Sequence, residues 1–255
     1  MRRALLKATA VIGLFGLLFC AGAYALQSQV NKTIVSATAS ITPRGLPGHG
    51  NAPVSISSVT RIKSTDGSQP PKLRQLVFIF DGNGTIDAKG LPVCAPAKLA
   101  GTTTALARKR CPGAIVGEGV GKADVRLPGQ APREVTLPLT FFNAPPEGGK
   151  PSLIAHAHET LPGPNTLLVP FSIERIDQGR YGFRVTIELP EIAGGFGAAT
   201  LAEATIGKTW KRGGKTVGYV NAHCVGGRLQ VHGALTFSNG DFFPGTLVSP
   251  CHVQG

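Results

Sequence analysis

The sequence predicts an all-β fold, either an antiparallel β-sandwich or an open barrel, with one short helical insert between Cys94 and Cys111. Apolar and polar residues alternate with the period of two that is typical of half-buried strands. The 34 Gly and 20 Pro, together with Asn, interrupt these stretches at short intervals. Helical spacing is scarcely visible outside the insert. About ten short strands separated in this way favour a sandwich or a barrel.

The N-terminus has the pattern of a secretory signal peptide. Two arginines and a lysine precede an uncharged apolar run from Ala8 to Cys20, and Ala23-Tyr24-Ala25 is the small-x-small motif that a signal peptidase cuts. We therefore expect a signal peptide over residues 1–25 and a secreted or extracytoplasmic chain. An uncleaved anchor helix is the alternative, because the run extended to Leu26 reaches roughly 20 residues.

The first expected strand is Thr33–Thr42, in which Val, Ala and Ile alternate with Ser and Thr. Val54–Lys63 alternates more weakly, and Lys72–Phe80 becomes continuously apolar, as a strand covered on both faces does. The turn residues Asp81–Gly84 favour a hairpin into Thr85–Ala88. The later expected strands are Ala114–Arg126, Arg133–Phe142, Ser152–Thr160, Thr166–Ile176, Tyr181–Leu189, Thr200–Thr209, Thr216–Cys224, Arg228–Ser238 and Phe243–Val248.

Between Cys94 and Cys111, the segments Ala95–Ala100 and Thr104–Arg110 are each expected to form a short helix. Three basic residues end the second segment, where the helix dipole favours cations, and Pro112 with Gly113 stops it. We expect residues 26–255 to form a single domain, with a subdivision near residues 147–149 as the alternative.

The net charge of +12 falls to +9 without Arg2, Arg3 and Lys7 of the signal peptide. An exported basic chain meets anionic polymers and lipid headgroups before it meets nucleic acid. We therefore expect an anionic envelope polymer or lipid as partner, with membrane contact otherwise only through an uncleaved signal, and no nucleic acid. The oligomeric state stays open.

The segments Lys89–Leu99, KGLPVCAPAKL, and Arg108–Val125, RKRCPGAIVGEGVGKADV, carry a family resemblance. Their Leu-Pro-x-Cys turn, short insert, Cys-Pro and Val-Gly-x-Gly strand resemble a group of exported actinobacterial proteins of unknown function. The resemblance runs from about Ile41 to Cys224. It implies export and an all-β protein of the cell envelope, and it transfers no activity or catalytic residue.

Four cysteines, Cys94, Cys111, Cys224 and Cys251, follow the signal peptide. An even number of cysteines in an exported chain favours disulfides, although four cysteines allow three connectivities. Proximity in the sequence favours Cys94 with Cys111 and Cys224 with Cys251. The first pair would close a loop of roughly 18 residues.

An alternative hypothesis is an envelope transpeptidase or hydrolase that uses a Cys–His pair, because His223-Cys224 and Cys251-His252 each place a thiol beside an imidazole. NAHCVGGR resembles the Ser-His-Gly-Cys-x-Arg signature of L,D-transpeptidases but lacks the glycine between His and Cys. TLVSPC resembles the Thr-Leu-x-Thr-Cys of sortases with one residue too many. Adjacent strand residues also point to opposite faces, so we assign no catalytic residue.

Two histidines, His156 and His158, share one face of an expected strand and could supply two ligands to a metal. His232 or Glu188 would be the third ligand. Histidines on a solvated sheet face are commoner, so we expect neither a metal nor a cofactor.

A basic hairpin around Gly213-Gly214 is the most suggestive surface feature. Cations beside an aromatic ring suit contact with anionic lipid or glycan. The alternative is a solvated edge hairpin whose lysines discourage strand pairing. The candidate ligand-binding residues are Lys208, Trp210, Lys211, Arg212 and Lys215.

No hydrolase, metalloprotease, phosphate-binding or dinucleotide motif is present in the sequence. We therefore expect a non-catalytic binding or structural module of the cell envelope that contacts anionic or amphipathic components.

Overall fold

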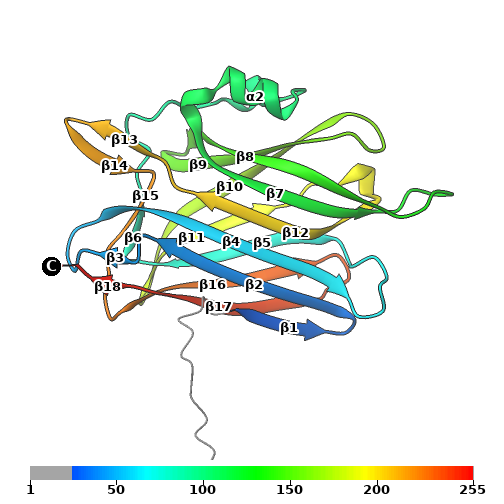
Figure 1. Cartoon of the computed structure of the whole chain (residues 1–255), viewed down its shortest axis with the longest axis horizontal. Coiled ribbons are helices and arrows are strands. Elements are labelled where there is room, and N and C mark those ends of the chain that lie inside the picture. Colours follow the sequence, from blue (N-terminus) through cyan, green and yellow to red (C-terminus); the bar gives the residue numbers. More distant parts are fainter. Residues whose placement is uncertain (1–24, 255) are drawn as a thin grey trace, which may run out of the picture.

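Fourteen strands form one sheet that curls into a nearly closed barrel (Figure 1). The computed structural model describes residues 25–254, so the predicted signal peptide lies outside the described residues except for Ala25. Twelve of the strands make the barrel wall, and neighbours in it are antiparallel. In spatial order they are β1 (Leu26–Val30), β2 (Thr33–Thr42), β4 (Ala52–Ser64), β12 (Gly197–Ile206), β7 (Ile115–Val125), β8 (Arg133–Glu147), β9 (Lys150–Glu159), β10 (Asn165–Gln178), β11 (Tyr181–Glu188), β5 (Leu73–Asp81), β16 (Arg228–Phe237) and β17 (Phe242–Pro250).

The two ends of this strand order meet along a seam between β17 and the first two strands. The Asp241 carboxylate, just before β17, accepts hydrogen bonds from Asn31 Nδ2 at 2.7 Å and from Thr33 Oγ1 at 3.0 Å. Farther along, the backbone N–H of Ile41 donates to Ser249 Oγ at 3.2 Å. The predicted all-β fold is confirmed, and of its two forms the barrel is the one observed.

Alternate residues of each wall strand face the interior, where they form the core. A main core, which includes Phe141 and Val185, fills one end of the barrel. A smaller core, which includes Val35 and Phe237, lies toward the other end. The two cores together therefore hold the wall at both ends.

Short strands cover the end that holds the main core. β3 (Gly45–Leu46) pairs in parallel with β18 (His252–Val253), and β15 (Val220–Ala222) pairs with β4 and β6 (Gly84–Ile86). The disulfide between Cys224 and Cys251 ties these segments together.

At the opposite end, two loops cross the barrel. The segments 65–72 and 189–196 connect strands that are not neighbours in the wall, β4 to β5 and β11 to β12. The side-chain amide of Gln69 donates to the backbone oxygen of Phe196 at 2.9 Å and joins the two loops.

Glycines let β7 approach β12 closely. A Cβ atom on Gly119 would lie 2.1 Å from the backbone oxygen of Glu203, and one on Gly117 would lie 2.5 Å from that of Thr205. Glycine is the residue that permits such an approach of two backbones. The Gly-x-Gly sequence thus serves the packing of these two strands.

The predicted helical insert is confirmed. It consists of α1 (Pro96–Leu99) and α2 (Thr104–Arg110), followed by a 3₁₀ turn at Pro112–Ala114. Its buried side chains, Leu99 and Ala107 among them, pack on the outer face of β8 and β9, as Figure 1 shows above the barrel. A disulfide between Cys94 and Cys111 closes the insert.

Several local predictions need correction. Thr33–Thr42 is the second strand, because β1 precedes it. The hairpin expected at Asp81–Gly84 does not form: β5 pairs with β11 and β16, whereas β6 pairs with β15. The expected strand Thr216–Cys224 is divided between β14 (Lys215–Gly218) and β15.

The alternative to a single domain was a subdivision near residues 147–149. In the structure, Gly148 and Gly149 form the turn between the paired strands β8 and β9. Among the described residues, no helix has the length and apolar composition that crossing a bilayer requires.

Candidate functional site

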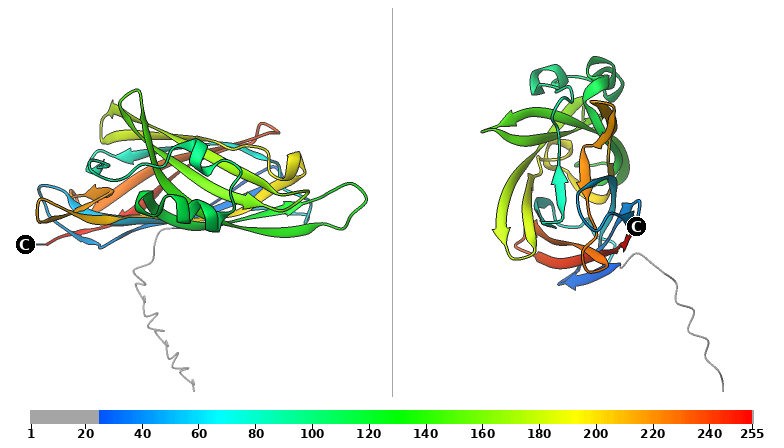
Figure 2. Two further views of the ribbon diagram at one scale, coloured as in Figure 1. Left: turned by 90° about the horizontal axis from the view of Figure 1, so that it is seen from above. Right: turned by 90° about the vertical axis from the view of Figure 1, so that its left-hand side faces the viewer.

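The basic hairpin forms as the sequence predicts. β13 (Thr209–Arg212) pairs with β14, and Arg212 faces Lys215 across the turn. Gly213 and Gly214 have φ angles of 57° and 78°, which a primed hairpin turn requires and glycine adopts without strain. Figure 2 shows the hairpin on the same side of the molecule as the helical insert.

Arg212 is bound to the chain itself. Its two terminal nitrogens donate to Asp87 at 3.0 and 2.6 Å, and one of them also donates to the backbone oxygen of Lys89 at 2.9 Å. These hydrogen bonds lower the pKa of Asp87 and raise the pKa of Arg212. Arg212 therefore holds the hairpin against the segment that leads into the insert.

Lys208 and Trp210 also contact the chain. Lys208 Nζ donates to the backbone oxygen of Gly113, directly after the insert, and burial lowers the pKa of this lysine. Trp210 is half-buried against the main core. Of the candidate residues, Lys211 and Lys215 are exposed, with Lys211 donating to Thr216 Oγ1 at 2.7 Å.

The hairpin and the insert together form one basic platform. Arg212 and Lys208 join the hairpin to the residues on either side of the insert. The cations of the basic platform are Lys89, Lys98, Arg108, Lys109, Arg110, Lys208, Lys211, Arg212 and Lys215.

The basic platform holds most of the net charge of the described chain. Residues 25–254 contain 23 of the 26 Lys and Arg and all 14 Asp and Glu, which leaves +9. The nine cations of the platform stand beside two carboxylates, Asp87 and Glu118, the second of which pairs with Arg108. Seven of the nine net charges thus lie here.

An exposed apolar side chain lies among these cations. Leu106 is 38% exposed, and Lys109 and Arg110 follow it by three and four residues on α2. Residues at this spacing share one helix face. That face of α2 is therefore both apolar and cationic.

The candidate metal ligands lie beneath the insert. His156 is fully buried, and its Nε2 lies 3.0 Å from Thr102 Oγ1 and 3.2 Å from the Thr102 backbone oxygen. Burial lowers the pKa of His156. The solvated sheet face considered for this histidine is wrong, because the insert covers it.

No third ligand joins His156 and His158. Among residues 25–254, no cluster of three metal-ligating side chains is present. Glu188 accepts a hydrogen bond from Gln75, and His232 bonds Thr246 at 3.0 Å. The structure thus offers no assembled metal site in its described part.

Both cysteine pairs are joined as proximity in the sequence favoured, with S–S distances of 2.02 Å for Cys94–Cys111 and 2.00 Å for Cys224–Cys251. A thiolate nucleophile requires a free sulfur. His223, beside Cys224, bonds Asn51 Oδ1 through Nδ1 at 2.8 Å.

Sequence reasoning assigned the cations of the hairpin but missed those of the insert. The run Arg108-Lys109-Arg110 was interpreted only as a helix end. Three consecutive cations next to an apolar residue were a signal that could have extended the site.

Neither a family model nor a curated protein matches this chain.

Proposed function

We propose that this chain is a non-catalytic binding module of the cell envelope, exported from the cytoplasm, which docks its basic platform on an anionic lipid surface. The observation that carries the proposal is the concentration of seven of nine net charges on the hairpin and insert. Each Lys or Arg close to an anionic bilayer contributes about 1 kcal/mol to binding.

The exposed apolar residue of α2 favours lipid over a purely anionic polymer. Leu106 lies on the same helix face as Lys109 and Arg110. An apolar side chain between cations can enter the boundary between headgroups and acyl chains, which a polymer does not offer. The two disulfides support an extracytoplasmic location.

A thiol enzyme is not proposed. Cys224 and Cys251 form a disulfide with each other, so neither offers a free thiol as a nucleophile. No observation on the described residues favours another reaction.

Cosedimentation of the purified protein with vesicles tests the proposal. Wild type is expected to bind phosphatidylglycerol vesicles and not phosphatidylcholine vesicles, with an affinity that falls as salt screens the charges. The platform variant Lys109→Glu/Arg110→Glu/Lys215→Glu should lose at least about tenfold in affinity.

The matched control is Lys63→Glu/Arg133→Glu/Arg228→Glu, which makes the same change in net charge at exposed positions outside the platform. Equal losses in both variants would show that net charge alone drives binding and would overturn the proposal. Binding to dextran sulfate without binding to anionic vesicles would assign a polymer as partner and reject the lipid surface.

A further inference from the structure

The middle of the barrel has small residues on part of its inner face, and they are not buried. Along β12, Ala202 faces the interior together with Ala204, which packs against the main core. Ala202 is nevertheless exposed. Its partners across the sheet are Thr60 on β4 and Gly121 on β7, both half-buried.

The same holds for β2, which lies beyond β4 in the wall. Ala37 and Ala39 on β2 lie between Ile41, at the main core, and Val35, in the smaller core. Both alanines are half-buried. On this side of the barrel, solvent therefore reaches the inner face between the two cores, whereas Leu137, Ala157 and Leu167 on the opposite side form a buried cluster.

Large apolar side chains from other strands also face this interior and remain half-buried. Leu76 and Phe78 of β5 and Val169 of β10 contact the main core without being covered by it. A space bounded by aliphatic and aromatic groups on one side and by Ala, Gly and Thr on the other suits an apolar chain.

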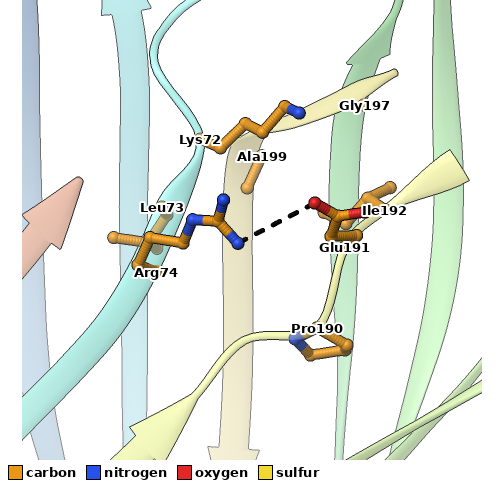
Figure 3. A pocket seen from close by; sticks show the side chains of 8 residues that line it. All are labelled: Lys72, Leu73, Arg74, Pro190, Glu191, Ile192, Gly197 and Ala199. Carbon is orange, nitrogen blue, oxygen red and sulfur yellow. Dashed lines mark ion pairs between the residues drawn. The ribbon is translucent and has the colours of Figure 1, made fainter. Parts of the chain in front are cut away.

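A pocket of about 10 Å³, room for one water molecule, lies at the end of the barrel that the two loops cross. Its lining includes Leu73, from the smaller core, and Ala199, which faces inward on β12 ahead of Ala202. Figure 3 shows Lys72 and Arg74 on one side of this pocket and Glu191 on the other. Arg74 Nη1 and Glu191 Oε1 are 3.9 Å apart, an ion pair between the two sides.

Lys72 lines the same pocket and takes no part in the ion pair between Arg74 and Glu191. It is half-buried, and its Nζ has no hydrogen-bond or ion-pair partner among residues 25–254. A half-buried ammonium group attracts an anion that can reach it. Lys72 therefore places one positive charge at this end of the barrel, beside Leu73 and Ala199 of the inner face.

We propose that the interior of the barrel binds the apolar chain of a fatty-acid-like ligand, with the anionic head of the ligand at Lys72. This site is separate from the basic platform, which covers the outer face of β8 and β9 and the other end of the molecule. It does not depend on the proposed docking to lipid surfaces.

Titration of the purified protein with oleate tests the inference, with tryptophan fluorescence and native mass spectrometry as readouts. Wild type is expected to bind one oleate. Ala202→Trp should weaken binding at least about tenfold, the loss expected when roughly two methylene groups are displaced from an apolar site. Thr205→Trp, the control on the outer face of the same strand, should bind like wild type.

The head group is tested separately. Lys72→Glu should weaken oleate binding about tenfold and leave oleyl alcohol unaffected, because only the carboxylate interacts with the lysine. Lys63→Glu, an exposed position on β4, is its control. If Ala202→Trp does not fold, as judged by circular dichroism, Ala202→Leu takes its place.

Absence of oleate binding by wild type, or equal binding by wild type and the folded interior variant, would overturn the inference. The platform variant Lys109→Glu/Arg110→Glu/Lys215→Glu should bind oleate normally even if it fails on vesicles. Loss of oleate binding in that variant would place the ligand on the platform and not in the barrel.

Discussion

The hydroxyl of Thr102 lies 3.0 Å from Nε2 of His156 and joins the helical insert to the barrel wall. The hydroxyl proton is donated to the backbone oxygen of Leu99 at 2.6 Å, so the oxygen is left to accept from the imidazole. Nε2 therefore carries the proton of a neutral imidazole. Nδ1 is buried and has no partner among residues 25–254.

This arrangement makes stability depend on pH. Burial lowers the pKa of His156 from its ordinary value of 6.5, so the unfolded chain binds more protons than the folded one between the two pKa values. The free energy of unfolding should thus decrease as pH falls below about 6.5. Urea denaturation at pH 7.5 and pH 5.5 measures it. His156→Gln should lose this slope while His232→Gln keeps it; an unchanged slope in His156→Gln would contradict the assignment.

Removal of the insert disulfide should free the insert from the wall. Cys94→Ala/Cys111→Ala opens a loop with a sequence separation of 17 residues, for which chain entropy predicts a loss of about 3 kcal/mol. His156 should then react with diethyl pyrocarbonate, which the insert otherwise blocks. Denaturation and mass mapping check the two effects, and a protected His156 in the variant would show that packing alone holds the insert.

Asp241 should be necessary for the barrel seam. Asp241→Ala removes the acceptor for Asn31, Thr33 and Asn239, of which Thr33 is buried, and a buried donor without a partner costs about 1–3 kcal/mol. Hydrogen bonds, that of Asn239 first, lower the pKa of Asp241 below 3.8, so this stabilisation is present above pH 3.8 and is lost as pH falls through the folded pKa. Thermal denaturation of Asp241→Ala and of the exposed control Asp177→Ala should show a large loss only in the first.

Two neighbouring glycines of β7 should respond differently to the same substitution. A Cβ at Gly119 would meet the backbone oxygen of Glu203 at 2.1 Å, whereas one at Gly121 would lie 3.8 Å from Leu137, an ordinary contact. Gly119→Ala should cost about 2 kcal/mol, because two backbones must separate, and Gly121→Ala much less. Urea denaturation of both variants measures the difference; equal stabilities would mean that β12 yields without cost.

The positions of most wall strands followed from local alternation, as Thr33–Thr42 illustrates. Their partners did not, because pairing is set by residues far apart: β5 continues into an apparent turn yet pairs with β11 and β16. β3 and β18 hold two residues each, too few to show a period. Strands this short therefore cannot be predicted from alternation in the sequence.

The candidate site shows the same limit. The hairpin turn was predictable from Gly213-Gly214, whereas the ion pair of Arg212 with Asp87 spans 125 residues and leaves no local trace. His156 was taken for a surface residue because the insert that covers it precedes it by about fifty positions in the chain, Thr102 being 54 residues away. Burial by a distant segment has no signature in a strand's own alternation.

The seam has a consequence for how the molecule is made. The Asp241 carboxylate, which accepts a hydrogen bond from Thr33, lies 208 residues after it, so β2 is synthesised long before its partner at the seam. Until then β2 and β4 have no closed wall to join, and their unpaired edges are exposed to other chains. Closure over such a distance in the chain is slow compared with local pairing. We expect a folding phase governed by docking of residues 241–250, during which aggregation competes with completion of the barrel.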